Sequence, residues 1–75
     1  MTDLMILLKE CCPVIDFSKE KKLMTNKIID SMDIVNIIAA LENKYDISIE
    51  FDMITSENFD SIETINAMIK KLQAN

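Results

Sequence analysis

The residues best suited to chemistry in this chain are Ser31 and its acidic neighbours Asp30 and Asp33, which lie where a long connection gives way to a periodic helix. Backbone N–H groups at the start of a helix have no partners within the helix. Together with the helix dipole, they favour a negatively charged group nearby, so a phosphate ester on an exposed Ser31 hydroxyl would be well accommodated. Asp and Ser are also the commonest helix caps, and position alone therefore leaves a cap and a modification site both open.

Other kinds of reactive site are poorly supported by the residue types present. The chain contains no histidine and no Cys-x-x-Cys spacing, so we expect no metal site of the zinc type. Cys11 and Cys12 are adjacent, and neighbouring cysteines rarely bridge because the ring is strained. We expect two reduced thiols, at least one of them buried as a small apolar side chain. No nucleophile is paired with a base, which argues against an independent enzyme.

The charge is distributed unevenly along the chain, which carries a net charge of −5. Nine acidic residues and a single base, Lys44, lie between Asp30 and Glu63, so this segment carries −8 and the remainder +3. We therefore expect partner proteins with basic patches, although acids that only keep a small protein soluble would give the same pattern. Because the chain is acidic and lacks arginine, nucleic acid is not an expected partner.

The length of 75 residues suffices for one domain, which we place at residues 1–75. A chain this short buries only about 60% of its unfolded surface, which favours a binding, carrier or interaction module over an enzyme with a deep cleft. No apolar run approaches the roughly 20 residues needed to span a bilayer. The acidic start Met1-Thr2-Asp3 is unlike a signal peptide. We expect a monomeric, cytoplasmic protein without a membrane span.

Helical periodicity dominates the sequence. Thr2 is predicted to cap the first helix and Pro13 to end it. Asp60 or Ser61 is predicted to cap the last helix, with Glu63 completing a capping box against Asp60. The alternating residues 47–51 are predicted to form an extended loop, because a lone strand has no ladder partner. The predicted helices cover residues 3 to 11 or 12, 31–45, 56–59 and 61–72.

Apolar side chains recur at helical spacing and predict one shared core. The expected buried stripes are Leu4, Leu7, Leu8 and Cys11; Val35, Ile38, Leu41 and Tyr45, widened by Ile34 and Ile37; and Ile62, Ile65, Ile69 and Leu72. Several apolar residues of the 13–30 connection are expected to enter this core, from among Val14, Phe17, Leu23, Met24, Ile28 and Ile29. The predicted fold is all-α, a small antiparallel bundle of three main helices plus one short helix, with a long first loop.

Residues 30–49 resemble the acyl carrier protein family. Asp30-Ser31-Met32 is similar to the Asp-Ser-Leu pattern of that family, and an amphipathic helix follows, and then an acidic turn with an aromatic residue and an isoleucine. Residues 57–63, Glu-Asn-Phe-Asp-Ser-Ile-Glu, resemble the start of the last helix in bacterial carrier proteins. The likeness spans most of the chain and agrees with its length, acidity and order of helices.

The resemblance implies a non-catalytic carrier. A phosphopantetheinyl transferase would attach 4'-phosphopantetheine from coenzyme A to Ser31, and the thiol of the arm would carry an acyl or aminoacyl group as a thioester. Asp30 would help the transferase dock around its magnesium, and Met32 would offer partners an apolar contact. The helix that partners read would present Asp33, Asn36 and Glu42. Further partners would be a loading ligase and acyl-transferring enzymes of fatty acid, polyketide or related biosynthesis.

Three features depart from the family pattern. No glycine precedes Ser31, and in its neighbourhood, Thr25-Asn26-Lys27, we expect Asn26 to take the left-handed conformation. Glu50 stands where a proline is common. Asn36 and Asn43 stand where the family often has acids, which suggests specialised partners. A D-alanyl carrier is a specific variant within the class. The alternative outside it is a small acidic helical adaptor, or a degenerate carrier, in which Ser31 stays unmodified.

Overall fold

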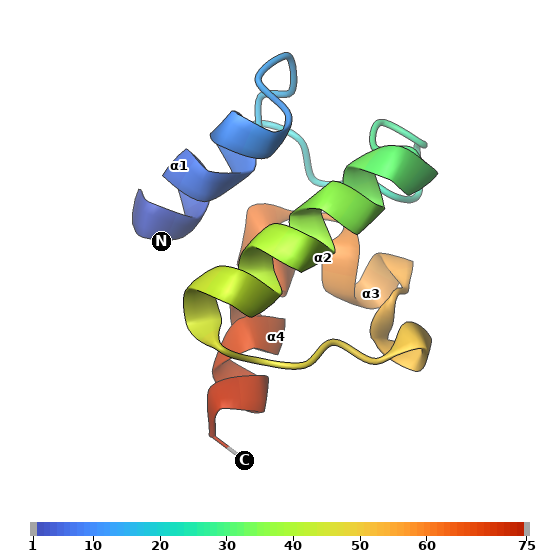
Figure 1. Ribbon diagram of the computed structural model, residues 1–75. Helices are drawn as coiled ribbons and strands as arrows, with labels where there is room; N and C mark the ends of the chain where they lie inside the picture. The colour runs from blue at the N-terminus through green and yellow to red at the C-terminus, as the bar shows by residue number, and fades with distance from the viewer. Residues whose placement is uncertain (1, 75) are drawn as a thin grey trace.

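The computed structural model of the protein describes residues 2–74, and these form helices joined by loops (Figure 1). No β-strand occurs within residues 2–74. The predicted all-α fold is confirmed, with three main helices, one short helix and an additional 3₁₀ turn. In chain order the elements are α1 (Thr2–Cys11), α2 (Ser31–Tyr45), the 3₁₀ turn η1 (Phe51–Met53), α3 (Ser56–Phe59) and α4 (Ile62–Gln73).

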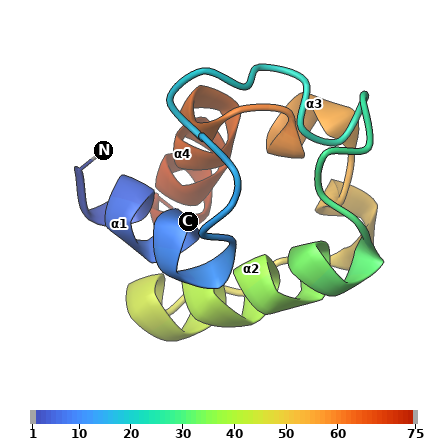
Figure 2. The same cartoon turned by 90° about the horizontal axis from the view of Figure 1, so that it is seen from above.

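The helices surround one core. α1 packs against both α2 and α4, and α3 packs against α4. α1 runs in the opposite sense to α2 (Figure 1). Seen from above, the connection between α1 and α2 passes over the end of α4 and beside α3 before it reaches the start of α2 (Figure 2). The long first loop therefore crosses the top of the bundle and sets where α2 begins.

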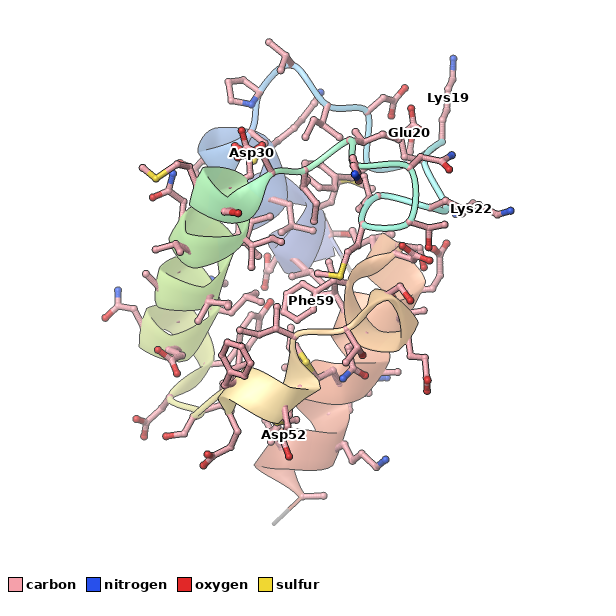
Figure 3. All side chains as sticks on the ribbon, turned by 90° about the vertical axis from the view of Figure 1, so that its right-hand side faces the viewer. Lys19, Glu20, Lys22, Asp30, Asp52 and Phe59 are labelled. Carbon is pink, nitrogen blue, oxygen red and sulfur yellow. The ribbon has the colours of Figure 1, made fainter. Side chains whose placement is uncertain are left out.

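The long connection contributes to the core as predicted. Phe17, Leu23 and Ile29 are buried, and Ile15 joins them, whereas Val14 is 96% exposed and does not. Phe59 lies between α2 and α4 in the side-chain view (Figure 3). The complete buried apolar set is Leu4, Leu8, Cys12, Ile15, Phe17, Leu23, Ile29, Ile37, Leu41, Phe59, Ile62, Ile65, Met68 and Ile69.

The Asp60 carboxylate fixes the connection to the junction of α3 and α4. Its Oδ1 accepts hydrogen bonds from the backbone N–H groups of Met24 at 3.0 Å and Thr25 at 2.8 Å. Its Oδ2 accepts one from the Thr25 hydroxyl at 2.6 Å. The Leu23 N–H donates to the Asp60 carbonyl at 2.8 Å. These bonds hold the pKa of Asp60 below its usual value, with the Thr25 hydroxyl as the largest cause.

The structure confirms Ser61 as the cap of the last helix, one of the two residues predicted, and corrects the other expected caps. Ser61 caps α4, and it forms its capping box with Thr64 rather than through Asp60 and Glu63. Asp60 is engaged with the long connection instead, and Glu63 forms an ion pair with Lys21 at 2.7 Å. Thr2 lies inside α1 rather than before it. These acids are satisfied by residues distant in the sequence, which the local pattern does not reveal.

Candidate site at the start of α2

Ser31 is the first residue of α2, and its side chain is exposed. The helix cap is the residue before it, Asp30, whose Oδ1 accepts from the Asp33 N–H at 2.9 Å. The Asp33 carboxylate completes the capping box by accepting from the Asp30 N–H at 3.3 Å. The Asp30 carbonyl also accepts the first helical bond, from the Ile34 N–H at 3.0 Å, which defines the capping position.

The capping role of Asp30 leaves the Ser31 hydroxyl free. Within residues 2–74, the Ser31 side chain forms no hydrogen bond, so the interpretation of Ser31 itself as the cap is wrong. The N–H groups of Ser31 and Met32 lie in the first turn of the helix, where no carbonyl of the helix can reach them. An exposed hydroxyl therefore stands beside unpartnered N–H groups, an arrangement that accommodates a phosphate ester.

The backbone before the site contains a left-handed residue, which is Lys27 and not Asn26 as expected. Lys27 has φ 56°. The Ile28 N–H donates to the Leu23 carbonyl at 2.8 Å, and the Lys27 N–H donates to the Met24 carbonyl at 3.1 Å. The same two hydrogen bonds occur where a helical turn ends in a residue with left-handed backbone angles, which here is Lys27. The bond pattern assigns the left-handed conformation to Lys27, and the preference of asparagine for that conformation does not override it.

The two cysteines lie close to the site but are poor nucleophiles. Both are free within residues 2–74, and Cys12 is buried, as predicted. Burial and then the neighbouring Asp33 carboxylate raise the pKa of the Cys12 thiol to about 11. Cys11 is half-buried, and its Sγ lies 4.0 Å from the Asn36 carbonyl oxygen, a weak contact between α1 and α2. Burial also raises the pKa of Cys11.

The exposed face of α2 is apolar next to Ser31. Met32 is 68% exposed and Val35 is 60% exposed, and they lie three residues apart on one side of the helix. The prediction that Val35 is buried is therefore wrong, because the packed side of α2 is centred on Ile37 and Leu41. The same face continues through the exposed residues Asn36, Ala39 and Asn43.

The five residues predicted to meet partners fall into two groups. Met32 and Asn36 lie on the exposed face of α2, and Asp30 is exposed at its start. Asp33 is half-buried in the capping box. Glu42 is also half-buried, and its Oε2 accepts from the N–H of residue 49 at 2.9 Å, which holds the chain that leaves α2. Val35 was missed because its apolar character suggested the core, although its spacing from Met32 places it on the same face.

The two ends of α2 differ in their surroundings. In Figure 3 the Asp30 end lies near the connection that carries Lys19, Glu20 and Lys22, whereas Asp52 of η1 lies at the other end of the molecule.

Within residues 2–74, no group of three or more His, Cys, Asp or Glu side chains is arranged to hold a metal ion. No helix in the same range has the length and apolar character to cross a membrane.

Comparison with curated proteins finds a similar protein from Bradyrhizobium diazoefficiens, which is named aminoacyl carrier protein 1. It is 40% identical over 47 residues, which cover 57% of this chain and 52% of that protein. This similarity supports membership of the carrier protein family. The chain matches about half the length of this curated relative. No family model matches the chain, and no solved structure matches it.

Proposed function

We propose that the protein is a non-catalytic carrier that holds aminoacyl or acyl groups on a 4'-phosphopantetheine arm attached to Ser31. The observation that carries the proposal is the exposed, unbonded Ser31 hydroxyl at the first position of α2, freed by the Asp30 cap. The similarity to an aminoacyl carrier protein supports the same assignment. We place this activity in one domain and in the cytoplasm.

The residues around Ser31 fit the attachment of such an arm. The Ser31 Oγ forms the phosphoester bond to the pantetheine phosphate of coenzyme A. The bond between the two phosphates of coenzyme A breaks, adenosine bisphosphate leaves, and the hydroxyl proton passes to the transferase. The free N–H groups of the first turn and the positive end of the helix dipole stabilise the phosphate near Ser31. When attached, the arm supplies a terminal thiol that carries the cargo as a thioester.

Asp30 has two roles in this proposal. Its Oδ1 caps α2 and so fixes the backbone on which Ser31 stands. Its second carboxylate oxygen accepts no hydrogen bond within residues 2–74, and on the exposed Asp30 side chain it would be open to contact from the transferase and its magnesium. Asp33 keeps the capping box closed rather than meeting the transferase directly. The structure of the site therefore depends on both acids, and the transferase reads one of them.

The choice of cargo favours aminoacyl groups. The curated relative is named as an aminoacyl carrier protein. The α2 face beside Ser31 carries Met32, Val35 and Asn36 in place of free carboxylates, which separates its chemistry from that of a strongly acidic recognition helix. A D-alanyl group is one member of the proposed cargo class. The partners are a phosphopantetheinyl transferase and a loading ligase.

Intact mass spectrometry tests the attachment. The protein is incubated with coenzyme A, magnesium and a broad-specificity phosphopantetheinyl transferase. Ser56 is the matched control, because it is also an exposed serine at the first position of a helix. We expect one added arm in the wild type and in Ser56→Ala, and none in Ser31→Ala. No mass gain with several transferases would instead identify a helical adaptor with an unmodified Ser31.

A further inference from the structure

The side chain of Phe51 is the largest apolar group that the structure leaves in solvent. It is 89% exposed on η1, whereas the other described phenylalanines, Phe17 and Phe59, are fully buried. An exposed phenyl ring gains nothing from folding, since its apolar area stays in water. Aromatic side chains, phenylalanine among them, are enriched in the buried cores of protein interfaces relative to the rest of the surface.

The η1 turn holds Phe51 outward through its backbone and its neighbours. The Met53 N–H donates to the Glu50 carbonyl at 3.0 Å, and the Ile54 N–H donates to the Phe51 carbonyl at 3.1 Å. Asn58 of α3 donates from Nδ2 to the Met53 carbonyl at 2.8 Å. Met53 and Ile54 pack against the core. These hydrogen bonds and the packing of Met53 and Ile54 fix the backbone of η1 with the Phe51 side chain exposed, so the ring is presented in advance of binding.

The carboxylates around Phe51 are free, unlike those elsewhere in the acidic half of the chain. Asp33, Glu42, Asp60 and Glu63 are all engaged within the fold, in the bonds described above. The carboxylates of four further acids form no hydrogen bond or ion pair within residues 2–74, and all four are exposed: Asp46, Glu50, Asp52 and Glu57. No lysine occurs between Lys44 and Lys70. Glu50 and Asp52 directly flank Phe51 in the sequence, so unneutralised negative charge lies on both sides of the exposed ring.

We infer that Phe51 is the anchor of a second docking surface, flanked by Glu50 and Asp52, for a protein that presents an apolar pocket bordered by lysine or arginine side chains. The inference rests on the proposed function, since we assign this surface to the enzyme that loads the carrier. The ring fills the pocket and supplies the affinity, and the flanking carboxylates steer and orient the basic border. Ser31 lies on the start of α2, and η1 lies at the opposite end of the same side of the molecule (Figure 3).

A titration with a defined probe tests the surface. The probe is a synthetic amphipathic helical peptide built only of leucine and lysine, which presents an apolar face with a basic border. Backbone amide NMR shifts of the full chain report where it binds. Val14→Ser is the matched control for Phe51→Ser, because Val14 is 96% exposed on a different loop. We expect shifts centred on residues 49–57, and roughly tenfold weaker binding or more for Phe51→Ser. Val14→Ser should bind as the wild type does.

Three results would overturn the inference. The first is equal binding by Phe51→Ser and the wild type, and the second is a set of shifts confined to the exposed face of α2. The third is a dimer of the protein alone that Phe51→Ser abolishes, which would assign the ring to a second copy of this chain. Intact mass separates the two proposals: a failure to modify Ser31 alongside Phe51-dependent binding would reject the carrier and the assignment to a loading enzyme, but would leave Phe51 as the anchor of a docking surface.

Discussion

Substitution of Asp30 separates its structural role from its proposed contact with the transferase. Asp30→Ala removes the Oδ1 acceptor of the Asp33 N–H and also the charge. Asp30→Asn removes the charge but keeps a side-chain oxygen in the same place, and Asn is as good a cap as Asp. The pair therefore forms a matched test, in which only one variant breaks the cap and both lose the carboxylate.

The expected loss of stability follows from the bonds at this cap. Asp30→Ala breaks the 2.9 Å bond but leaves the reciprocal bond, because that one runs from the Asp30 backbone N–H to the Asp33 carboxylate. One lost cap bond costs about 1 kcal/mol. In a domain of this size, 1 kcal/mol lowers the melting temperature by roughly 4–8 °C. Asp30→Asn should stay within about 0.5 kcal/mol of the wild type.

Circular dichroism melts measure the stability, and intact mass over time measures the rate of modification. We expect Asp30→Ala to melt earlier, Asp30→Asn to melt with the wild type, and both to be modified more slowly than the wild type. Two outcomes would refute the reasoning. An Asp30→Asn protein as unstable as Asp30→Ala would show that the charge and not the cap matters for folding. Wild-type modification rates in both variants would remove Asp30 from the transferase contact.

Three further perturbations test the fold around the site. The hydrogen bond from the Thr25 hydroxyl lowers the pKa of Asp60 in the folded protein. The Asp60 carboxylate therefore contributes its full stabilisation above the pKa that it has in the unfolded chain, and this stabilisation is lost as the pH falls through its pKa in the folded protein. Asp60→Asn should therefore be less stable at neutral pH and lose less stability between about pH 5 and pH 2 in urea titrations. Iodoacetamide near neutral pH should label Cys11 before Cys12, because burial holds the pKa of Cys12 at about 11, as peptide mass mapping would show. Lys27→Gly should raise stability by about 0.5–1 kcal/mol in the same urea titrations, since glycine adopts φ 56° without strain.

Each of these expectations has a contrary result. Parallel pH profiles for Asp60→Asn and the wild type would mean that the bonds to the long connection do not contribute to stability. Labelling of Cys12 first in the folded protein would contradict its burial. A less stable Lys27→Gly protein would show that the lysine side chain stabilises the turn more than its left-handed backbone destabilises it.

The sequence predicted the helices well where local signals are strong. The bounds of α2 at Ser31 and Tyr45 match the prediction, because an acidic cap precedes the helix and the apolar period ends at Tyr45. α3 was also placed correctly over residues 56–59. The all-α fold followed from the same periodicity, which contains no paired strands.

The faces and the loop contacts could not be obtained from local patterns. Four of the five residues 34–38 are apolar and spread over an arc of about 160° of the α2 circumference, and only the positions of α1 and α4 decide that Val35 is exposed. The bonds from Asp60 to Met24 and Thr25 join residues 35 and 36 positions apart. Long-range contacts of this kind redirect an acid that local spacing had assigned to a helix cap.

Fragment-ion mass spectrometry of the modified protein tests the central claim most directly. After reaction with coenzyme A, magnesium and a phosphopantetheinyl transferase, the protein is digested and the residue that carries the arm is read from the fragment series. The account predicts one arm on Ser31, next to the Asp30 cap, and an unmodified Ser56. An arm on Ser56 or any other serine, or no arm at all, would contradict it.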